Sequence, residues 1–260
     1  MKIYLSKKNT YLALFLKSIP IGLANTLPGV SGGTIALVLN IYETLINAIK
    51  DIKVKKLVFI GLGAVVGVFI GSAVITDLYQ NQPLIVNYFL FGLVITSAHS
   101  TYKKIGHLSF LKLLVMLLAF AFALFFAREI QFGFMNAEGL MLFFIAGFFG
   151  SVAMILPGIS GGTLLILMGV YHPVLNAINN FDLLILIVFG AGVAAGLLVF
   201  AWLFSYLLQK HQKEIMVILT GLILGSSAAV FPARFNIGGL AAFAAGAVII
   251  IILEIIGQNT

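Results

Sequence analysis

The chain has 260 residues, of which 62% are hydrophobic and only 9% are charged, and its mean hydropathy is +1.16. This composition excludes a soluble domain with a charged surface. The absence of cysteine excludes disulfide bonds and thiolate metal sites. In so apolar a chain, the formal net charge of +7 indicates lysines beside membrane-spanning helices, and no nucleic acid is needed to explain it.

The first apolar segment, residues 11–49, predicts a helical hairpin. The basic residues before it are not followed by a small-residue cleavage site, so we expect the N-terminus to be retained. Pro28, Gly29, Gly32 and Gly33 interrupt the segment and leave two arms of about 17 residues each. As one helix the segment would be roughly 58 Å long, nearly twice the thickness of the hydrocarbon core, so we expect it to turn back.

Three uninterrupted apolar spans follow the hairpin, and the same arrangement then recurs. The first unit, residues 1–129, has spans at 57–79, 84–102 and 110–127. The second unit, residues 130–260, has a hairpin at 139–178 and spans at 183–208, 215–231 and 238–256. We expect the two units to form one integrated membrane domain.

A sequence repeat relates the two units. The segment from Leu27, LPGVSGGTIALVLNIYETLINAI, matches LPGISGGTLLILMGVYHPVLNAI from Leu156 at 11 of 23 positions, with a constant offset of 129 residues. A hairpin contributes an even number of crossings and the three spans an odd number, so the second unit should be inverted. We therefore predict an all-α polytopic membrane protein with two inverted-topology repeats, each a re-entrant helical hairpin plus three transmembrane helices.

The basic residues predict the orientation, because cytoplasmic loops near membrane spans collect Lys and Arg. With the N-terminus in the cytoplasm, thirteen lysines lie on or near the cytoplasmic side and two arginines, Arg128 and Arg234, face out. Both termini are thus predicted to be cytoplasmic. The thirteen lysines are Lys2, Lys7, Lys8, Lys17, Lys50, Lys53, Lys55, Lys56, Lys103, Lys104, Lys112, Lys210 and Lys213.

The repeated Pro-Gly-x-Ser-Gly-Gly-Thr break predicts a binding site. Non-helical backbone at membrane depth is tolerated only where it is buried in protein or lines a polar cavity. The outgoing half-helix presents amide donors, hydroxyl groups and the partial positive charge of its N-terminus, and together these favour an anion. The predicted binding residues are Ser31, Gly32, Gly33, Thr34, Ser160, Gly161, Gly162 and Thr163.

A structural explanation of the motif stays open. The glycines would then only let the hairpins pack closely, and the hydroxyls would only satisfy local backbone groups. The duplication of both hydroxyls favours binding, since close packing needs only small residues. The motif lacks the Lys of a nucleotide-binding P-loop.

Five further polar residues are secondary candidates. Lys17 and Glu43 lie at equal sequence distances from the hairpin tip, and we expect an interfacial pair, with a role in headgroup entry as the minority interpretation. Asn25 precedes the first break, where a packing hydrogen bond explains it at least as well as ligand contact. Arg128 and Arg234 on the outer face would contact lipid headgroups or gather a phosphate.

At NTLPGVSGGTIALVLNIYE and MILPGISGGTLLILMGVYHPVL the chain resembles the bacterial polyprenyl-phosphate transporter family, formerly described only as a domain of unknown function. The length and the two-unit layout extend the resemblance over essentially the whole chain. It implies that the protein returns undecaprenyl phosphate from the outer to the cytoplasmic leaflet of the bacterial cytoplasmic membrane for cell-envelope synthesis. The motif residues would hold the phosphate headgroup while the polyprenyl tail stays among membrane lipids.

Two other classes of function remain as alternatives. An ion channel or ion-coupled small-anion transporter would also use half-helix termini at a broken hairpin. A membrane hydrolase acting on lipid phosphates is poorly supported, because the spans lack a cluster of acid-base or metal-binding side chains, so we expect no enzyme activity. We expect no cofactor or metal; coupling to a proton or sodium gradient and the oligomeric state stay open.

Overall fold

The structure is a computed structural model that describes residues 10–26, 30–127 and 139–258, and these residues form helices and connecting turns without a strand. The helices are α1 (Thr10–Asn25), α2 (Gly32–Val38), α3 (Tyr42–Lys50), α4 (Val54–Asn81), α5 (Pro83–Tyr102), α6 (Phe110–Ala127), α7 (Leu140–Ile155), α8 (Gly161–Leu167), α9 (Tyr171–Asn179), α10 (Leu183–Lys210), α11 (Gln212–Ser226), the 3₁₀ helix η2 (Ser227–Val230) and α12 (Ile237–Gln258). The predicted all-α membrane fold is confirmed.

Most of the predicted spans coincide with long helices. Among the described residues, five helices are long and apolar enough to cross a membrane, or up to seven if each of two bent helix pairs counts as one span. The five are α4, α5, α10, α11 with η2, and α12. The span predicted at 110–127 forms α6, which falls with α1 and α7 among the shorter apolar helices. Pro83 begins α5, where its missing N–H leaves no helical hydrogen bond unmade.

The second arm of each hairpin differs from the prediction. We expected one arm of about 17 residues after each break, but a second turn divides it into α2 and α3, bent by 115°, and into α8 and α9, bent by 103°. The turns centre on Asn40, with a φ of 54°, and Gly169, with a φ of 71°. Asn and Gly are the residues that adopt a positive φ most readily, so these two positions end α2 and α8.

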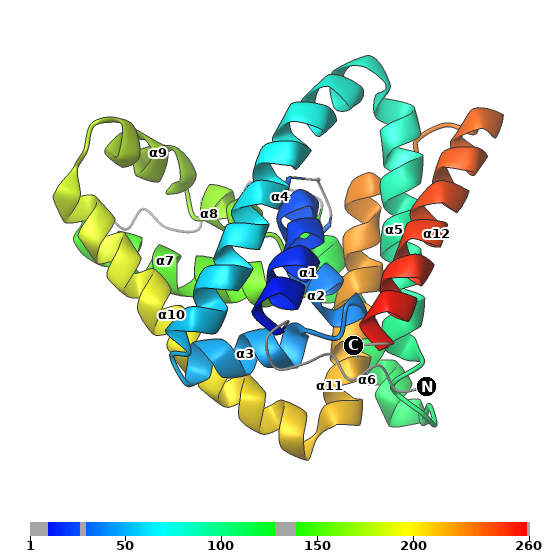
Figure 1. Cartoon of the computed structure of the whole chain (residues 1–260), viewed down its shortest axis with the longest axis horizontal. Coiled ribbons are helices and arrows are strands. Elements are labelled where there is room, and N and C mark those ends of the chain that lie inside the picture. Colours follow the sequence, from blue (N-terminus) through cyan, green and yellow to red (C-terminus); the bar gives the residue numbers. More distant parts are fainter. Residues whose placement is uncertain (1–9, 27–29, 128–138, 259–260) are drawn as a thin grey trace.

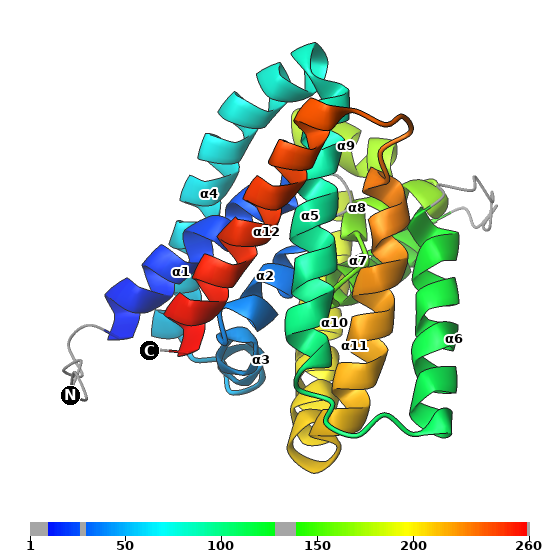
Figure 2. The same cartoon turned by 90° about the vertical axis from the view of Figure 1, so that its right-hand side faces the viewer.

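The helices pair in the same way in both halves of the chain. α1 packs along α4, and α7 packs along α10; α5 packs along α12, and α11 along α6. In Figure 1, α7 to α10 form a lobe on the left, and α5, α11 and α12 stand together on the right. Figure 2 shows α12, α5, α11 and α6 as a row of neighbouring helices. The buried core lies where these groups meet around α2, whose seven residues are all buried.

Close glycine contacts also recur at the offset of 129 residues. A Cβ at Gly63 or Gly67 would overlap a backbone carbonyl oxygen of α1, that of Phe15 or Ile19 respectively. A Cβ at Gly192 or Gly196 would likewise overlap the carbonyl oxygen of Phe144 or Phe148 in α7. The bounds of α2, α3 and α4 are those of α8, α9 and α10 shifted by the same offset. This agreement supports the duplication, while the inverted relation of the two units stays a prediction.

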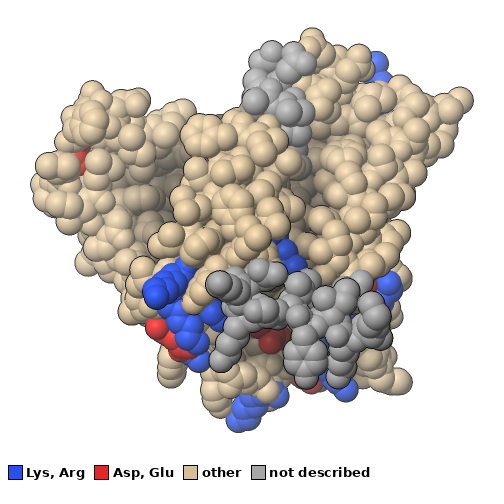
Figure 3. Space-filling view, in the orientation of Figure 1, with Lys and Arg blue, Asp and Glu red and all other residues tan. Residues whose placement is uncertain are grey.

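Charged side chains gather on one side of the molecule. Figure 3 shows most of the visible Lys, Arg, Asp and Glu over the lower part of the view, where Figure 1 places α3 and the turn between α10 and α11. The exposed lysines of these turns include Lys53, Lys55, Lys210 and Lys213. The structure thus brings basic turns that are far apart in the sequence to the same side.

Candidate functional site

The first motif begins α2 and is capped by two side chains. Ser31 is the N-cap residue, and its Oγ accepts a hydrogen bond from the N–H of Gly33 at 3.2 Å. The Oδ1 of Asn25, at the end of α1, accepts from the N–H of Gly32 at 2.9 Å. The side chain of Asn25 therefore accepts a hydrogen bond from a backbone N–H group of the motif, which is the packing role that its position before the break suggested.

The amide donors of this first motif are not free. Besides the bonds of Gly32 and Gly33, the N–H of Thr34 donates to the carbonyl oxygen of Ser31 at 2.9 Å. Ser31 and Thr34 are 8% and 3% exposed. The prediction that both breaks present open amides is therefore wrong for the first motif in this conformation, because Asn25 and Ser31 supply its acceptors.

The second motif is more open. The Oγ of Ser160 accepts from the N–H of Thr163 at 3.3 Å, and the structure shows no acceptor among the described residues for the N–H groups of Gly161 and Gly162. Ser160 is exposed and the other three residues are partly exposed. Met154 stands where the offset of 129 residues would place a counterpart of Asn25, so this break has no amide oxygen to close it.

The two motifs touch each other. The Oγ of Ser31 donates to the carbonyl oxygen of Leu156 at 3.2 Å, just before the second break. A Cβ at Gly33 would overlap the carbonyl oxygen of Ile155. Gly158 has a φ of 81° and lies against the backbone of Leu222 in α11, so a side chain there would be both strained and without space. These contacts bring the two breaks together in the fold.

The secondary candidates are more scattered. The Nζ of Lys17 donates to the carbonyl oxygen of Leu39 at 3.2 Å, and Oε1 of Glu43 accepts from Gln212 at 3.1 Å. The pairing of Lys17 with Glu43 stays a prediction. The side chain of Arg234 is exposed, and its carbonyl oxygen accepts from the hydroxyl of Tyr88 at 3.1 Å. Arg128 lies outside the described residues.

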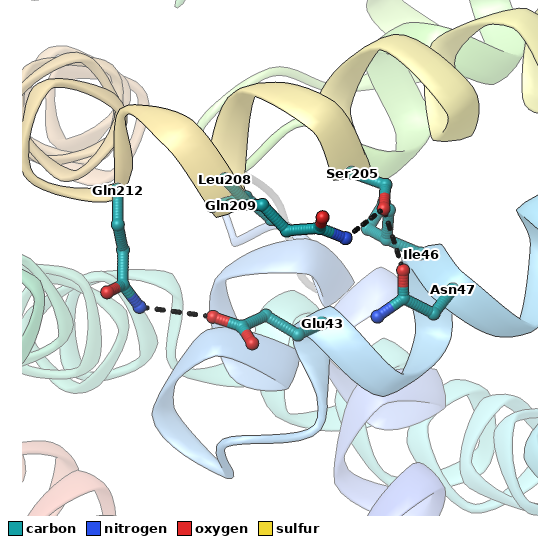
Figure 4. Close-up of a pocket in the computed structure, with 7 residues that line it drawn as sticks. All are labelled: Glu43, Ile46, Asn47, Ser205, Leu208, Gln209 and Gln212. Atoms are coloured by element: carbon teal, nitrogen blue, oxygen red, sulfur yellow. Dashed lines mark hydrogen bonds between the residues drawn. The ribbon is translucent and has the colours of Figure 1, made fainter.

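A polar network between α3 and α10 was not predicted. The Oγ of Ser205 donates to Oδ1 of Asn47 at 2.8 Å and accepts from Nε2 of Gln209 at 3.3 Å and from Nζ of Lys50 at 3.3 Å. Ser205 is only 3% exposed. Figure 4 shows Asn47, Ser205 and Gln209 facing one another at a pocket of about 210 Å³. The seven residues that line it are Glu43, Ile46, Asn47, Ser205, Leu208, Gln209 and Gln212.

Two lysines, Lys50 and Lys53, pair with the carboxylate of Asp51 at the end of α3. Nζ of Lys53 lies 2.7 Å from Oδ2 of Asp51, and Nζ of Lys50 lies 3.6 Å from Oδ1. The hydrogen bond from Lys53 holds the pKa of the Asp51 carboxyl below its ordinary value, with the nearby charge of Lys50 acting in the same direction. Across the described ranges, no group of three or more His, Asp and Glu side chains is arranged to hold a metal ion.

Known proteins resemble the chain over most of its length. A family described as undecaprenyl phosphate translocase-like matches residues 21–59 and 50–244. A polyprenyl-phosphate transporter of Vibrio cholerae serotype O1 is 33% identical over 252 residues, covering 87% of this chain and 79% of that protein. A polyprenyl-phosphate transporter of Staphylococcus aureus is 34% identical over 241 residues, covering 84% and 85%. No solved structure matches the chain significantly.

Proposed function

Because the chain belongs to the undecaprenyl phosphate translocase-like family, we propose that it returns undecaprenyl phosphate to the cytoplasmic leaflet of a bacterial inner membrane. Its relatives support transport of a polyprenyl-phosphate lipid in general. The recycling direction, which would resupply cell-envelope synthesis, is the finer part of the proposal. Because the family is one of transporters, we propose no chemical step on the lipid.

The proposed phosphate site is the second motif, with the first motif as its closed partner. The observation that carries this assignment is the pair of N–H groups at Gly161 and Gly162, which have no protein acceptor within the described part of the chain, beside the hydroxyls of Ser160 and Thr163. A phosphate brings several strong acceptor oxygens and negative charge, which hydrocarbon opposes and backbone donors favour. The same groups in the first motif already donate to Asn25 and Ser31.

The outer surface of the protein suits a lipid tail. In Figure 3 the surface is hollowed between the left lobe, which Figure 1 assigns to α7 to α10, and the rest of the molecule. Large apolar side chains of α10 are exposed on that lobe, among them Leu183, Ile187, Val199 and Trp202. A polyprenyl chain would remain in contact with lipid there while only the headgroup crosses.

The orientation belongs to the same proposal. The side that carries the exposed lysines of α4, α10 and α11 would face the cytoplasm, because Lys and Arg are enriched in cytoplasmic loops. Both chain termini would then be cytoplasmic.

Leaflet exchange of undecaprenyl phosphate by purified protein in liposomes tests the proposal. The variant Ser160→Ala should slow exchange roughly tenfold or more, since a hydrogen bond to a charged group contributes about 1.5–3 kcal/mol. Ser227→Ala is the matched control, because its hydroxyl donates to the carbonyl oxygen of Leu224 and to neither motif.

Normal exchange by a correctly folded Ser160→Ala variant would remove this hydroxyl from the mechanism. The natural protein could instead exchange no lipid phosphate and take up inorganic phosphate or carry an electrical current. That result would support the small-anion or channel alternative. Repeating the measurement with and without a proton or sodium gradient tests energy coupling.

A further inference from the structure

The loop between η2 and α12, residues 231–236, is fastened to α5 and to α12. The buried Tyr88 of α5 donates its hydroxyl to the carbonyl oxygen of Arg234 at 3.1 Å and accepts from the N–H of Asn236 at 3.1 Å. The Oδ1 of Asn236 in turn accepts from the N–H of Gly239 at 3.2 Å, in the first turn of α12. These bonds fix the backbone on both sides of residue 235, so the side chain of Arg234 extends from a fixed point.

The same loop carries a cation among exposed apolar side chains. The side chain of Arg234 is exposed, and it forms no ion pair or side-chain hydrogen bond with the part of the chain that the structure describes. Phe231, Phe235 and Ile237 are exposed around it. Exposed apolar side chains beside a charged one, at the end of a membrane-spanning helix, are typical of the membrane–water interface. The guanidinium is therefore presented at the depth of the lipid headgroups.

This loop lies at the end of the molecule opposite to the lysines. α5 and α12 run in the same direction, because Tyr88 meets Arg234 near their first residues and Ser100 donates to Glu254 at 2.6 Å near their last. Lys103 lies 3.7 Å from Glu254 at that second end. Figure 2 shows the loop at the upper end of α11 and α12, and Figure 3 shows most charged side chains toward the lower end. In the proposed orientation Arg234 faces the outer leaflet.

α11 connects this loop to the second motif. The backbone of Leu222 in α11 lies against Gly158, two residues before Ser160. From Leu222 to Val230, α11 and η2 add eight residues, so the loop begins roughly 13 Å farther along the axis than this contact. A headgroup held at the loop would thus lie on the outer side of the proposed phosphate site and close to it.

We propose that Arg234 binds the phosphate monoester headgroup of the lipid substrate at the outer leaflet, before the headgroup enters the second motif. The exposed Phe231 and Phe235 would contact the part of the polyprenyl chain next to the phosphate. The inference rests on the proposed transport function and adds to it the residue that first recognises the substrate.

The chemistry of the guanidinium favours this ligand over an ordinary phospholipid. A guanidinium stays protonated and can donate two parallel hydrogen bonds to one phosphate group. A phosphate monoester carries a charge of about −1.5 to −2 and three terminal oxygens near neutral pH. The diester of a phospholipid such as phosphatidylglycerol has a single negative charge and two terminal oxygens. Arg234 should therefore bind the monoester more tightly.

Protection of Arg234 from phenylglyoxal, a reagent that modifies arginine, tests this binding without transport. The full-length protein is placed in phosphatidylcholine liposomes, and modification of residue 234 is measured by mass spectrometry of its peptide. Undecaprenyl phosphate should slow the modification about tenfold when about nine-tenths of the sites are occupied. The same protection should remain in Ser160→Ala, because the proposed contact lies outside the second motif. No protection, or equal protection by phosphatidylglycerol, would overturn the proposal.

The kinetics of leaflet exchange test the role of this contact in transport. Arg234→Gln should raise the lipid concentration for half-maximal exchange about tenfold, because it removes a charge-assisted contact, and should leave the maximal rate nearly unchanged. Arg234→Lys should restore part of the loss, since it keeps the charge without the planar fork. Lys55→Gln removes an exposed charge on the lysine-rich side and is the matched control, with kinetics like those of the natural protein.

The two measurements separate this inference from the proposed function. Exchange of undecaprenyl phosphate with the same half-maximal concentration in Arg234→Gln would reject the role of Arg234 and leave the transport function in place. Protection of Arg234 by undecaprenyl phosphate in a natural protein that exchanges no lipid would reject the transport function and leave the binding site in place.

Discussion

Ser31 donates a hydrogen bond to the carbonyl oxygen of Leu156 at 3.2 Å, and this bond joins the break of the first hairpin to the break of the second. The two residues are 125 positions apart in the chain. The N-terminus of α2 thus rests on the C-terminal end of α7, and the donors of the first motif are used within the protein. The second motif keeps its donors open beside this contact, so the pair forms an unequal site.

The equivalent glycines Gly33 and Gly162 should respond differently to alanine. A methyl group at Gly33 would overlap the carbonyl oxygen of Ile155, whereas at Gly162 the nearest atom is Oγ of Ser160 at 3.8 Å. Gly33→Ala should lower the free energy of unfolding by about 1–3 kcal/mol, and Gly162→Ala should leave it nearly unchanged. Thermal unfolding in detergent measures both, and equal destabilisation by the two variants would contradict the unequal packing.

Asn25→Ala should destabilise the first break. It removes the acceptor of the Gly32 N–H and leaves that donor unsatisfied, which costs about 1 kcal/mol as for other lost helix caps. Asn25→Asp keeps an acceptor oxygen and serves as the control. Hydrogen exchange at the Gly32 amide should become faster in the alanine variant only; unchanged exchange there would show that Asn25 does not protect this group.

Gly63 and Gly61 lie two residues apart on α4, one in a close helix contact and the other on the free surface of the helix. A side chain at Gly63 would meet the backbone of Phe15, while at Gly61 nothing lies within 4 Å. Gly63→Leu should prevent α1 from approaching α4 and should lower the melting temperature strongly, whereas Gly61→Leu should be tolerated. Gly192→Leu and Gly190→Leu repeat the comparison on α10, and a reversed order in either pair would be inconsistent with these contacts.

Lys104 should help to hold the turn between α2 and α3 in place. Its Nζ donates to Oδ1 of Asn40 at 2.7 Å and to the carbonyl oxygen of Leu37 at 3.4 Å, so it contacts the turn between α2 and α3. In a variant that carries Asn47→Cys and Ser205→Cys, Lys104→Met should reduce cross-linking between positions 47 and 205 severalfold. Lys103→Met is the control, because Lys103 instead lies 3.7 Å from Glu254. Equal yields in the two variants would show that the turn needs no support from Lys104.

Much of the fold follows from hydropathy and from the repeat. The long spans were predictable because uninterrupted apolar segments of about 20 residues leave few alternatives in a membrane. The bends at Asn40 and Gly169 were not predicted, since neither residue has a proline beside it in its apolar run. The one signal in the sequence that could have indicated these bends is that Asn40 and Gly169 occupy equivalent positions in the two units.

The site was predictable only in outline. The motif residues could be named from their composition and spacing, but the sequence does not show that Asn25 would fill the donors of one motif and not the other. The network of Asn47, Ser205 and Gln209 was missed because neutral polar residues near helix ends have many ordinary explanations. Its recurrence at the offset of 129 residues distinguishes it from other polar residues of this kind.

The turns at Asn40 and Gly169 give the two hairpins unequal stiffness. Asparagine occupies the left-handed region at some energetic cost, and here its Oδ1 is also held by Lys104; glycine enters and leaves that region freely, and Gly169 has no neighbour within 4 Å of an added Cβ. The elbow between α8 and α9 is therefore the softer hinge. The angle between α8 and α9 can therefore change at a lower energetic cost than the angle between α2 and α3.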